Sequence, residues 1–488
     1  MSSAGLSPAV KRLAVVVVLG AFMSILDTTI VNVALETLSR DLDAPLDEVQ
    51  WVATAYLLAL AAVIPVTAWA ARRVGSRTLY IWSLVLFTAG SALCGLAWNV
   101  ESLVAFRVLQ AIGGGMIMPV GQMVMARTAG PQNMGRVMAV IGVPIVMAPV
   151  LGPVLGGILV QELSWEWIFF VNVPVGIVAV LAAQRLFPEE APEPAGRLDL
   201  TGLALLATGL PLTIFGLTEL GIQGTLVATQ VLVPLLAGLG LTASFVAHAL
   251  RSDHPLLDLR LFANRAFAAA AATTFALGAA LFGALIIVPL YYQGLRAEGA
   301  ITTGLLLAPQ GIGAALAMPR SGSLTDRFGG GPVTIVGIVI LAAATLPFAF
   351  AGPDTSYVLL CLALVVRGIG LGLAMMPAFA AAYAALTPAQ VGDATPQLNV
   401  LQRIGGSFGT AVLTVVLTTQ LEGAASPQAG ADAFNLTFLI AAVVTMLGVV
   451  PAVILTQVER RARAGRLAAA RVGTEADRAQ AAEKRVVA

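Results

Sequence analysis

The chain has 488 residues, of which 58% are hydrophobic and 11% are charged, with a mean hydropathy of +0.90. A soluble domain carries about 25% charged residues, so these values exclude a soluble globular protein and predict an all-α protein of the membrane. The net charge of +1 favours no nucleic-acid partner, and the two cysteines and two histidines lack metal-ligand spacing. We expect the lipid bilayer as a partner, no cofactor, no metal, and cysteines that only pack.

Apolar segments of the length that crosses a ~30 Å bilayer core, about 20 residues, recur along the whole chain. The first follows Lys11 and Arg12 as in a signal peptide, but its length and the lack of a small-residue cleavage site indicate a retained helix. In chain order the fourteen predicted spans are 13–38, 51–71, 78–98, 102–126, 137–160, 166–187, 200–220, 227–249, 266–291, 301–319, 333–351, 356–379, 397–420 and 433–456.

Loop charge predicts the orientation of these spans. With fourteen spans, nearly all loop arginines and lysines fall on the side of the two termini, and only Arg40 and Arg296 fall on the other. Because cytoplasmic loops are enriched in Lys and Arg, both termini are predicted to be cytoplasmic. The scarcity of lysine beside abundant arginine, alanine and glycine indicates a GC-rich bacterial genome, and therefore a multi-pass protein of the bacterial inner (plasma) membrane.

An internal echo divides the chain. Short, basic, glycine-containing turns are predicted at 68–77 and 322–329, each after the second helix of a six-helix set. Parallel repeats of this kind are one established plan for transporters, with the substrate path between the halves. The predicted units are a first half at 1–187, a linker and two inserted helices at 188–265, a second half at 266–456, and a cytoplasmic tail at 457–488, helical in part.

Asp27 lies near the middle of the first span, where a carboxylate costs several kcal/mol, and we interpret it as a proton carrier. Arg107, in span 102–126, is predicted to lie within about two helical turns of it in depth. A changing separation of the two charges would switch the proton affinity of Asp27, and Gln110 shares the face of Arg107. The alternatives are a structural acid paired with a neighbouring helix and an arginine bonded to backbone carbonyls.

Two sets of residues are predicted to serve conformational change. Proline bends a helix and glycine lets another backbone approach, which indicates close packing in span 137–160, although generic packing is the alternative. A carboxylate in the turn after span 301–319 is predicted to act as a latch, with a plain turn residue as the alternative. The sets are Gly152, Pro153, Gly156 and Gly157, and Gly322, Asp326, Arg327 and Gly329.

Further polar residues are candidates for a substrate cavity: Gln110, Arg367, Gln402, Arg403 and Glu219. No acid lies inside the spans of the second half, so Arg367 is predicted to face water, a carbonyl cluster or an anionic group. Glu219 stands at the outer end of its span, where reaching toward the interface is the simpler interpretation.

These motifs together resemble the fourteen-helix drug:proton antiporters of the major facilitator superfamily, over residues 13–456. The resemblance implies two six-helix bundles with two inserted helices, and proton-coupled multidrug efflux linked to antibiotic resistance. The stretch 152–157 in the fifth predicted span resembles a motif of that family that is associated with antiport, so the resemblance also implies antiport. The stretches that carry the resemblance are 26–35, 107–115, 152–157, 164–174 and 402–407.

The sequence departs from that family at three places. Arg72 stands where the superfamily pattern has Asp, which moves the predicted latch role to Asp326, and position 111 is Ala rather than Gly. Glu36 replaces a common proline and is a candidate second acid near the exit path.

The leading hypothesis is a secondary antiporter that exports amphipathic, often cationic compounds as a monomer in exchange for protons. A dedicated exporter of one metabolite, antibiotic or lipid is the alternative within the same class. A membrane-embedded enzyme or sensor is the alternative from another class, and no nucleophile–base set or nucleotide loop supports it.

Overall fold

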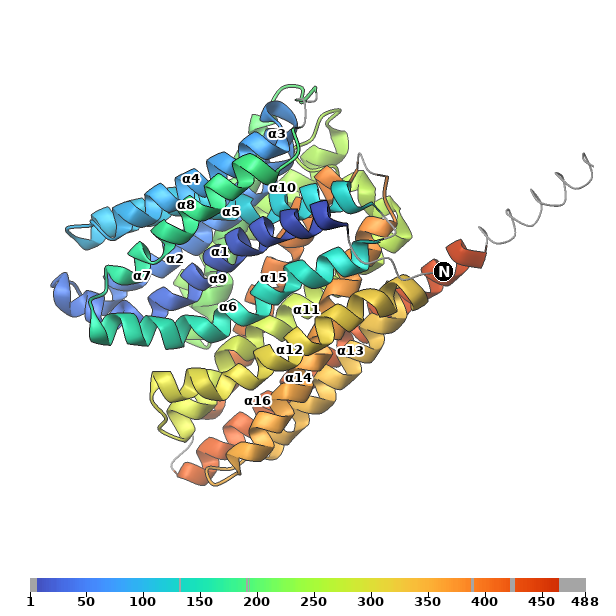
Figure 1. The fold of residues 1–488 in the computed structure, drawn as a ribbon. Coiled ribbons are helices and arrows are strands. Elements are labelled where there is room, and N and C mark those ends of the chain that lie inside the picture. The colour runs from blue at the N-terminus through green and yellow to red at the C-terminus, as the bar shows by residue number, and fades with distance from the viewer. Residues whose placement is uncertain are drawn as a thin grey trace, which may run out of the picture.

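The structure is a computed structural model, and it describes residues 7–130, 133–189, 192, 194–387, 390–421 and 426–464. Within these residues the regular structure is entirely helical. The helices run side by side with their connections at two opposite ends, and residues 7 and 464 lie at the same end (Figure 1). We call this the terminal end of the molecule and the opposite one the distal end.

The first group of helices covers the residues before the inserted pair. The second span is made of α2, a short 3₁₀ segment at Pro65 and α3, and the sixth is made of α7 and α8. The bounds are α1 (Pro8–Asp41), α2 (Leu46–Val63), η1 (Ile64–Val66), α3 (Thr67–Val74), α4 (Ser76–Cys94), α5 (Val100–Ala129), α6 (Met134–Glu162), α7 (Trp167–Phe170) and α8 (Asn172–Leu186).

The remaining helices begin with the inserted pair, α9 (Leu200–Gln223) and α10 (Thr229–Arg251). Residues 449–464 continue the last helix toward the terminal end. The other bounds are η3 (Leu259–Ala263), α11 (Arg265–Leu290), η4 (Tyr291–Leu295), α12 (Ala300–Phe328), α13 (Gly330–Thr345), η5 (Leu346–Phe350), α14 (Tyr357–Ala384), α15 (Val391–Leu421) and α16 (Pro427–Leu447).

Thirteen helices in the described part of the chain are long and apolar enough to cross a membrane. α6 adds a helix of 29 residues, within which the segment Leu151–Glu162 is also apolar. These helices occupy the fourteen predicted positions and confirm an all-α membrane protein. Most predicted bounds agree to within about five residues. The larger differences are that span 301–319 continues to Phe328, span 397–420 begins at Val391, and span 433–456 begins at Pro427 and continues to residue 464.

The turns predicted at 68–77 and 322–329 are wrong in extent, because α3 and α12 continue through most of them. Gly75 and Gly329 alone separate consecutive helices there, with φ of 84° and 97°. A residue with a side chain rarely adopts such angles, so glycine lets the chain reverse in one residue. The sequence echo is therefore a structural echo: a long basic helix end, one glycine, and the next helix.

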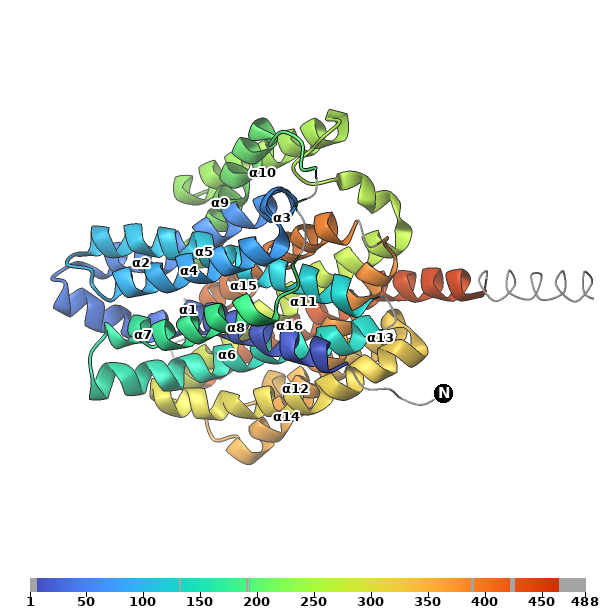
Figure 2. The ribbon, with the colours of Figure 1, turned by 45° about the horizontal axis from the view of Figure 1, so that its top comes forward.

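The inserted pair packs as a unit, since α9 and α10 lie along one another. α9 also contacts α2 of the first group and α15 of the last, and the pair stands to one side of the other helices (Figure 2). Helices α1 to α8 pack mainly among themselves, as α11 to α16 do, and α6 lies against α12 and α14 between the two groups. The division at the stated boundaries remains a prediction. Of the predicted tail, 457–464 is helical and 465–488 lies outside the described residues.

Candidate functional site

Asp27 and Arg107 form an ion pair inside the first group of helices. Asp27 Oδ2 accepts from Arg107 Nη1 at 2.5 Å, between the middle of α1 and the first turns of α5. The two side chains are 0% and 1% exposed. A buried pair of this kind is costly to form, and the loss of either partner leaves the other charge without compensation.

Two amide side chains complete the coordination of the carboxylate. Asp27 Oδ1 accepts from Gln110 Nε2 at 2.9 Å and from Asn172 Nδ2 at 3.0 Å, so donors from α5 and α8 meet on α1. Gln110 Oε1 in turn accepts from Arg107 Nη1 at 2.7 Å, and Arg107 Nε donates to the Val52 carbonyl on α2 at 3.1 Å. A network with every charge satisfied holds these helices in one arrangement.

Aromatic rings enclose the guanidinium. Its Cζ lies 3.8 Å from the ring centre of Tyr56 on α2 and 5.7 Å from that of Phe169 on α7, which are cation–π distances. The Tyr56 hydroxyl has no hydrogen-bond partner among the described residues. Cys94, predicted only to pack, has its Sγ 3.6 Å from Gln110 Oε1 and so borders the site.

Asn172 and Tyr56 are the site residues that the motif analysis did not assign. Asn172 lies within the stretch 164–174 and is 2% exposed, and its Nδ2 also donates to Ser91 Oγ at 3.1 Å. A buried asparagine in an apolar helix needs partners, and this was the available signal. Tyr56 carried no such signal, because aromatic residues are common in ordinary helix packing.

The glycine-rich stretch of α6 packs beside the ion pair. A Cβ on Gly152 would overlap Thr29 Oγ1, and one on Gly156 would lie 2.9 Å from Ile30 Cγ1, both on α1. On Gly157 it would lie 3.0 Å from Ile301 Cγ1 on α12. Pro153 sits between these contacts, where a Cβ on Gly304 would come within 3.6 Å of it. The stretch therefore joins the Asp27 helix to the second group.

Polar contacts between the two groups gather at the terminal end. Asp326 on α12 pairs with Arg136 on α6 at 3.3 Å, as a latch between groups requires. Arg72 on α3 pairs with Asp393 on α15 at 2.5 Å, so the departure at position 72 supplies a second cross-group pair that the sequence did not indicate.

The other residues of that set do not cross between groups. Arg327 lies 5.0 Å from the ring centre of Phe328, Gly322 is inside α12, and Gly329 forms the turn. Nearer the middle of the bundle, Asn399 Nδ2 donates to Gln122 Oε1 at 2.8 Å and joins α15 to α5.

Arg367 lies in the middle of α14, 3% exposed, and its guanidinium contacts neutral oxygens. Nη1 donates to Gln310 Oε1 at 2.5 Å, Nε to Thr345 Oγ1 at 3.3 Å, and Nη2 to the Ala280 carbonyl at 3.3 Å. Water, a carbonyl cluster or an anionic group was predicted around Arg367. In the structure its partners are neutral oxygens from three helices, and one of them is a backbone carbonyl.

Gln402 and Arg403 lie on α15. Gln402 Nε2 is 3.8 Å from Met375 Sδ, and its backbone packs against Gly278 of α11. Arg403 is half-buried beside α2 and α9, near enough to interact electrostatically with Tyr56. It makes no hydrogen bond or ion pair with a described residue.

Two acidic residues that the sequence analysis named as candidates lie away from Asp27. Glu219 borders a separate pocket between α2, α9 and α10. Glu36 is 90% exposed and pairs with Arg40 one turn later at 3.8 Å, so it is not near the Asp27 site. In the described ranges no group of three or more His, Cys, Asp or Glu has the arrangement of a metal site.

The sequence model of the Major Facilitator Superfamily matches residues 17–410, most of the helical bundle. The chain belongs to this superfamily. It is therefore a multi-pass membrane transporter of small molecules and not an enzyme.

Among relatives of this superfamily transporter is the "Multidrug resistance protein B homolog" of Mycobacterium tuberculosis (strain ATCC 25618 / H37Rv). The two are 43% identical over 412 residues, which are 84% of this chain and 76% of the relative. The "Putative multidrug resistance protein MdtD" of Klebsiella pneumoniae (strain 342) is 35% identical over 361 residues, 72% of this chain and 75% of that one. The structure of the human organic anion transporter MFSD10 aligns with a TM-score of 0.62 at 18% identity, covering 92% and 100%, which shows a shared fold.

Proposed function

We propose that this transporter is a proton-coupled antiporter that exports amphipathic drugs or toxic metabolites from the cytoplasm. The observation that carries the proposal is the buried pair of Asp27 and Arg107. A secondary transporter driven by protons needs a carboxylate that binds a proton in one state and loses it in another. The names of the relatives, which describe multidrug resistance proteins, support the substrate class.

Proton coupling follows from what a proton does to this pair. Protonation of Asp27 removes the negative charge and leaves Arg107 without its counter-charge in a buried site. The preferred positions of α1 and α5 then differ between the two protonation states. Since α6 packs on α1 through Gly152 and on α12 through Gly157, a shift of α1 is carried toward the second group.

We infer alternating access by relative motion of the two groups about a mid-membrane cavity. The cross-group pairs of Arg72 and Arg136 close the terminal end in this conformation. We place that end, with both termini, in the cytoplasm of a bacterium, in agreement with the excess of basic loop residues there. We expect a monomer, because the ion pairs between the two groups of helices form within a single chain.

The test is transport of a fluorescent drug into proteoliposomes driven by an imposed pH gradient. Asp27→Asn keeps the side-chain shape but holds no exchangeable charge, so gradient-driven flux should fall at least tenfold while drug binding to the purified protein persists. Reversing the gradient should reverse the flux of the unchanged protein. The matched control is Glu36→Gln, an exposed acid on the same helix, which should transport normally.

Full gradient-driven flux by Asp27→Asn would refute proton coupling at this residue. Drug flux in the same direction as the proton flux would indicate symport instead. Normal flux in Glu36→Gln together with loss in Asp27→Asn would assign coupling to the buried acid and not to the charge of the helix.

A dedicated exporter of one metabolite is the second candidate, and Arg403 is the observation that favours it. Its guanidinium has no hydrogen-bond or ion-pair partner in the described part of the chain, so an anionic or zwitterionic substrate would compensate its charge. A panel of cationic, neutral and anionic compounds in the same flux assay separates the candidates. Export confined to one anionic compound, lost in Arg403→Gln, would favour the dedicated exporter.

A further inference from the structure

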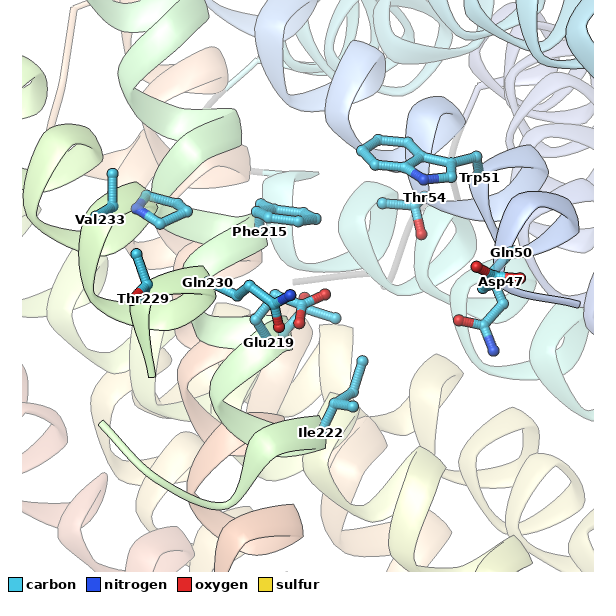
Figure 3. Close-up of a pocket in the computed structure, with 12 residues that line it drawn as sticks. Asp47, Gln50, Trp51, Thr54, Phe215, Glu219, Ile222, Thr229, Gln230 and Val233 are labelled. Carbon is cyan, nitrogen blue, oxygen red and sulfur yellow. The ribbon is translucent and has the colours of Figure 1, made fainter. Parts of the chain in front are cut away.

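A pocket of about 540 Å³ opens at the distal end between α2 and the inserted pair, far along the helices from the cross-group pairs of the terminal end. Its walls come from the first two turns of α2, the last two of α9 and the first of α10 (Figure 3). Volumes of this size are typical of sites for small molecules. The pocket lies apart from the buried Asp27 pair, none of whose residues lines it.

Two carboxylates give the pocket its charge. Asp47 belongs to the α2 wall and Glu219 to the α9 wall, and the close-up shows them on different sides of the space (Figure 3). Neither makes a hydrogen bond or an ion pair with a described residue. The described residues that line the pocket include no lysine, arginine or histidine, so its two acids have no counter-charge among them.

Aromatic and aliphatic groups form the rest of the surface. Trp51 and Phe215 stack with ring centres 5.9 Å apart and join α2 to α9. Trp51 remains 46% exposed, and Ile222 and Val233 remain more exposed still, at 61% and 58%. An exposed indole face binds cations, and the aliphatic walls accept an apolar body.

We propose that this pocket binds a lipophilic organic cation, such as a quaternary ammonium or phosphonium compound, at the distal end of the transporter. The carboxylates of Asp47 and Glu219 supply the charge complement, and Trp51 supplies a π face beside them. A zwitterionic lipid headgroup fits less well, because its phosphate would meet two carboxylates. The site is distinct from proton coupling and holds the cation whether or not Asp27 is charged.

Photolabelling of the full chain in lipid nanodiscs reports on this pocket directly. An azido derivative of tetraphenylphosphonium is expected to label peptides that contain 47–54, 215–222 or 229–234, and unlabelled tetraphenylphosphonium should compete. In the double variant Asp47→Asn, Glu219→Gln this labelling should fall at least fivefold. Trp51→Ala should lower it independently, and thermal unfolding checks that each variant is folded.

The matched control is the pair Glu101→Gln, Glu162→Gln, which removes two acids from the same distal end outside the pocket. Its labelling should stay within twofold of the unchanged protein. An equal loss in this control would assign the effect to surface charge and overturn the proposal. Unchanged labelling in the pocket variant, or equal competition by the anion tetraphenylborate, would overturn it too. Labelling that persists in Asp27→Asn separates this site from the proton-coupling proposal.

Discussion

Arg107 and Arg367 are both buried arginines in long helices, but their partners differ in charge. Arg107 meets the carboxylate of Asp27, whereas Arg367 meets an amide oxygen, a hydroxyl and a backbone carbonyl. The sequence indicated this contrast, because it places an acid in the first span and none within the second-half spans. The identity of the neutral partners was not predictable, since any buried polar atom within reach of a long arginine would serve.

Replacing each arginine by methionine should therefore have unequal effects on stability. Arg107→Met leaves a buried carboxylate without its counter-charge, for which we expect a loss of about 3–5 kcal/mol. Arg367→Met leaves only neutral acceptors, for which we expect about 1–3 kcal/mol. Unfolding of the purified variants in detergent by a denaturant measures both.

The double variant Asp27→Asn, Arg107→Met provides the internal control, because it removes both charges of the pair. It should be more stable than Arg107→Met alone. Equal losses in the two single arginine variants, or no recovery in the double variant, would contradict the assignment of the energy to the unpaired charge.

At the scale of elements, Asp199 organises the inserted pair. It precedes α9 as its N-cap and accepts from the Gly202 amide at 2.8 Å. It also accepts from the Leu256 amide at 3.1 Å and lies 2.9 Å from His248 Nε2 on α10. Burial by itself would raise the pKa of Asp199, but these hydrogen bonds outweigh it and hold the pKa below its ordinary value. One carboxylate thus ties the start of α9 to the end of α10 and the following loop.

Asp199→Ala should lower stability by about 1 kcal/mol at neutral pH, the usual cost of losing an N-cap. A carboxyl with a lowered pKa stabilises the fold above its unfolded value of about 3.9, and this stabilisation is lost as pH falls through the lower folded value. The difference in Tm between the two proteins should therefore be largest at neutral pH and vanish in acid.

Asp258→Ala is a suitable comparison, because that carboxylate is half-buried and, among the described residues, accepts from the Arg260 amide alone. Its effect on Tm should be smaller. A Tm difference for Asp199→Ala that stays constant down to strongly acidic pH would contradict a role for the ionised carboxylate.

At the scale of the whole molecule, ion pairs at the terminal end join the two groups of helices, and we expect them to favour the conformation seen here. Arg72 and Asp393 are 321 positions apart and connect α3 to α15. Their charges are equal and opposite, so reversing one creates repulsion and reversing both restores the pair. At 24% exposed each, they are partly screened by solvent, and the expected energy of the pair is about 1 kcal/mol or less.

Arg72→Asp should therefore open the terminal end in a larger share of molecules, at least twofold more, and Asp393→Arg should do the same. Spin labels at Arg73→Cys and Thr387→Cys, with Cys94→Ser and Cys361→Ser as background, report the separation by pulsed electron resonance. The double reversal should return the distance distribution to that of the unchanged protein. A distribution that is unaffected by either single reversal would exclude the pair as a latch.

The sequence by itself determined that the protein lies in a membrane, how many spans it has, and that Asp27 is the buried acid. These follow from composition and from the local cost of polar groups in lipid, which is a property of each segment alone. The tertiary structure decided which distant residues meet: Asn172 reaches Asp27 across 145 positions, and Arg72 finds Asp393. It also decided that Glu219 faces Trp51 and Asp47 across a pocket. Such contacts depend on how helices pack against one another. Membrane helices share a similar apolar composition, so the composition of one helix does not specify which helices become its neighbours.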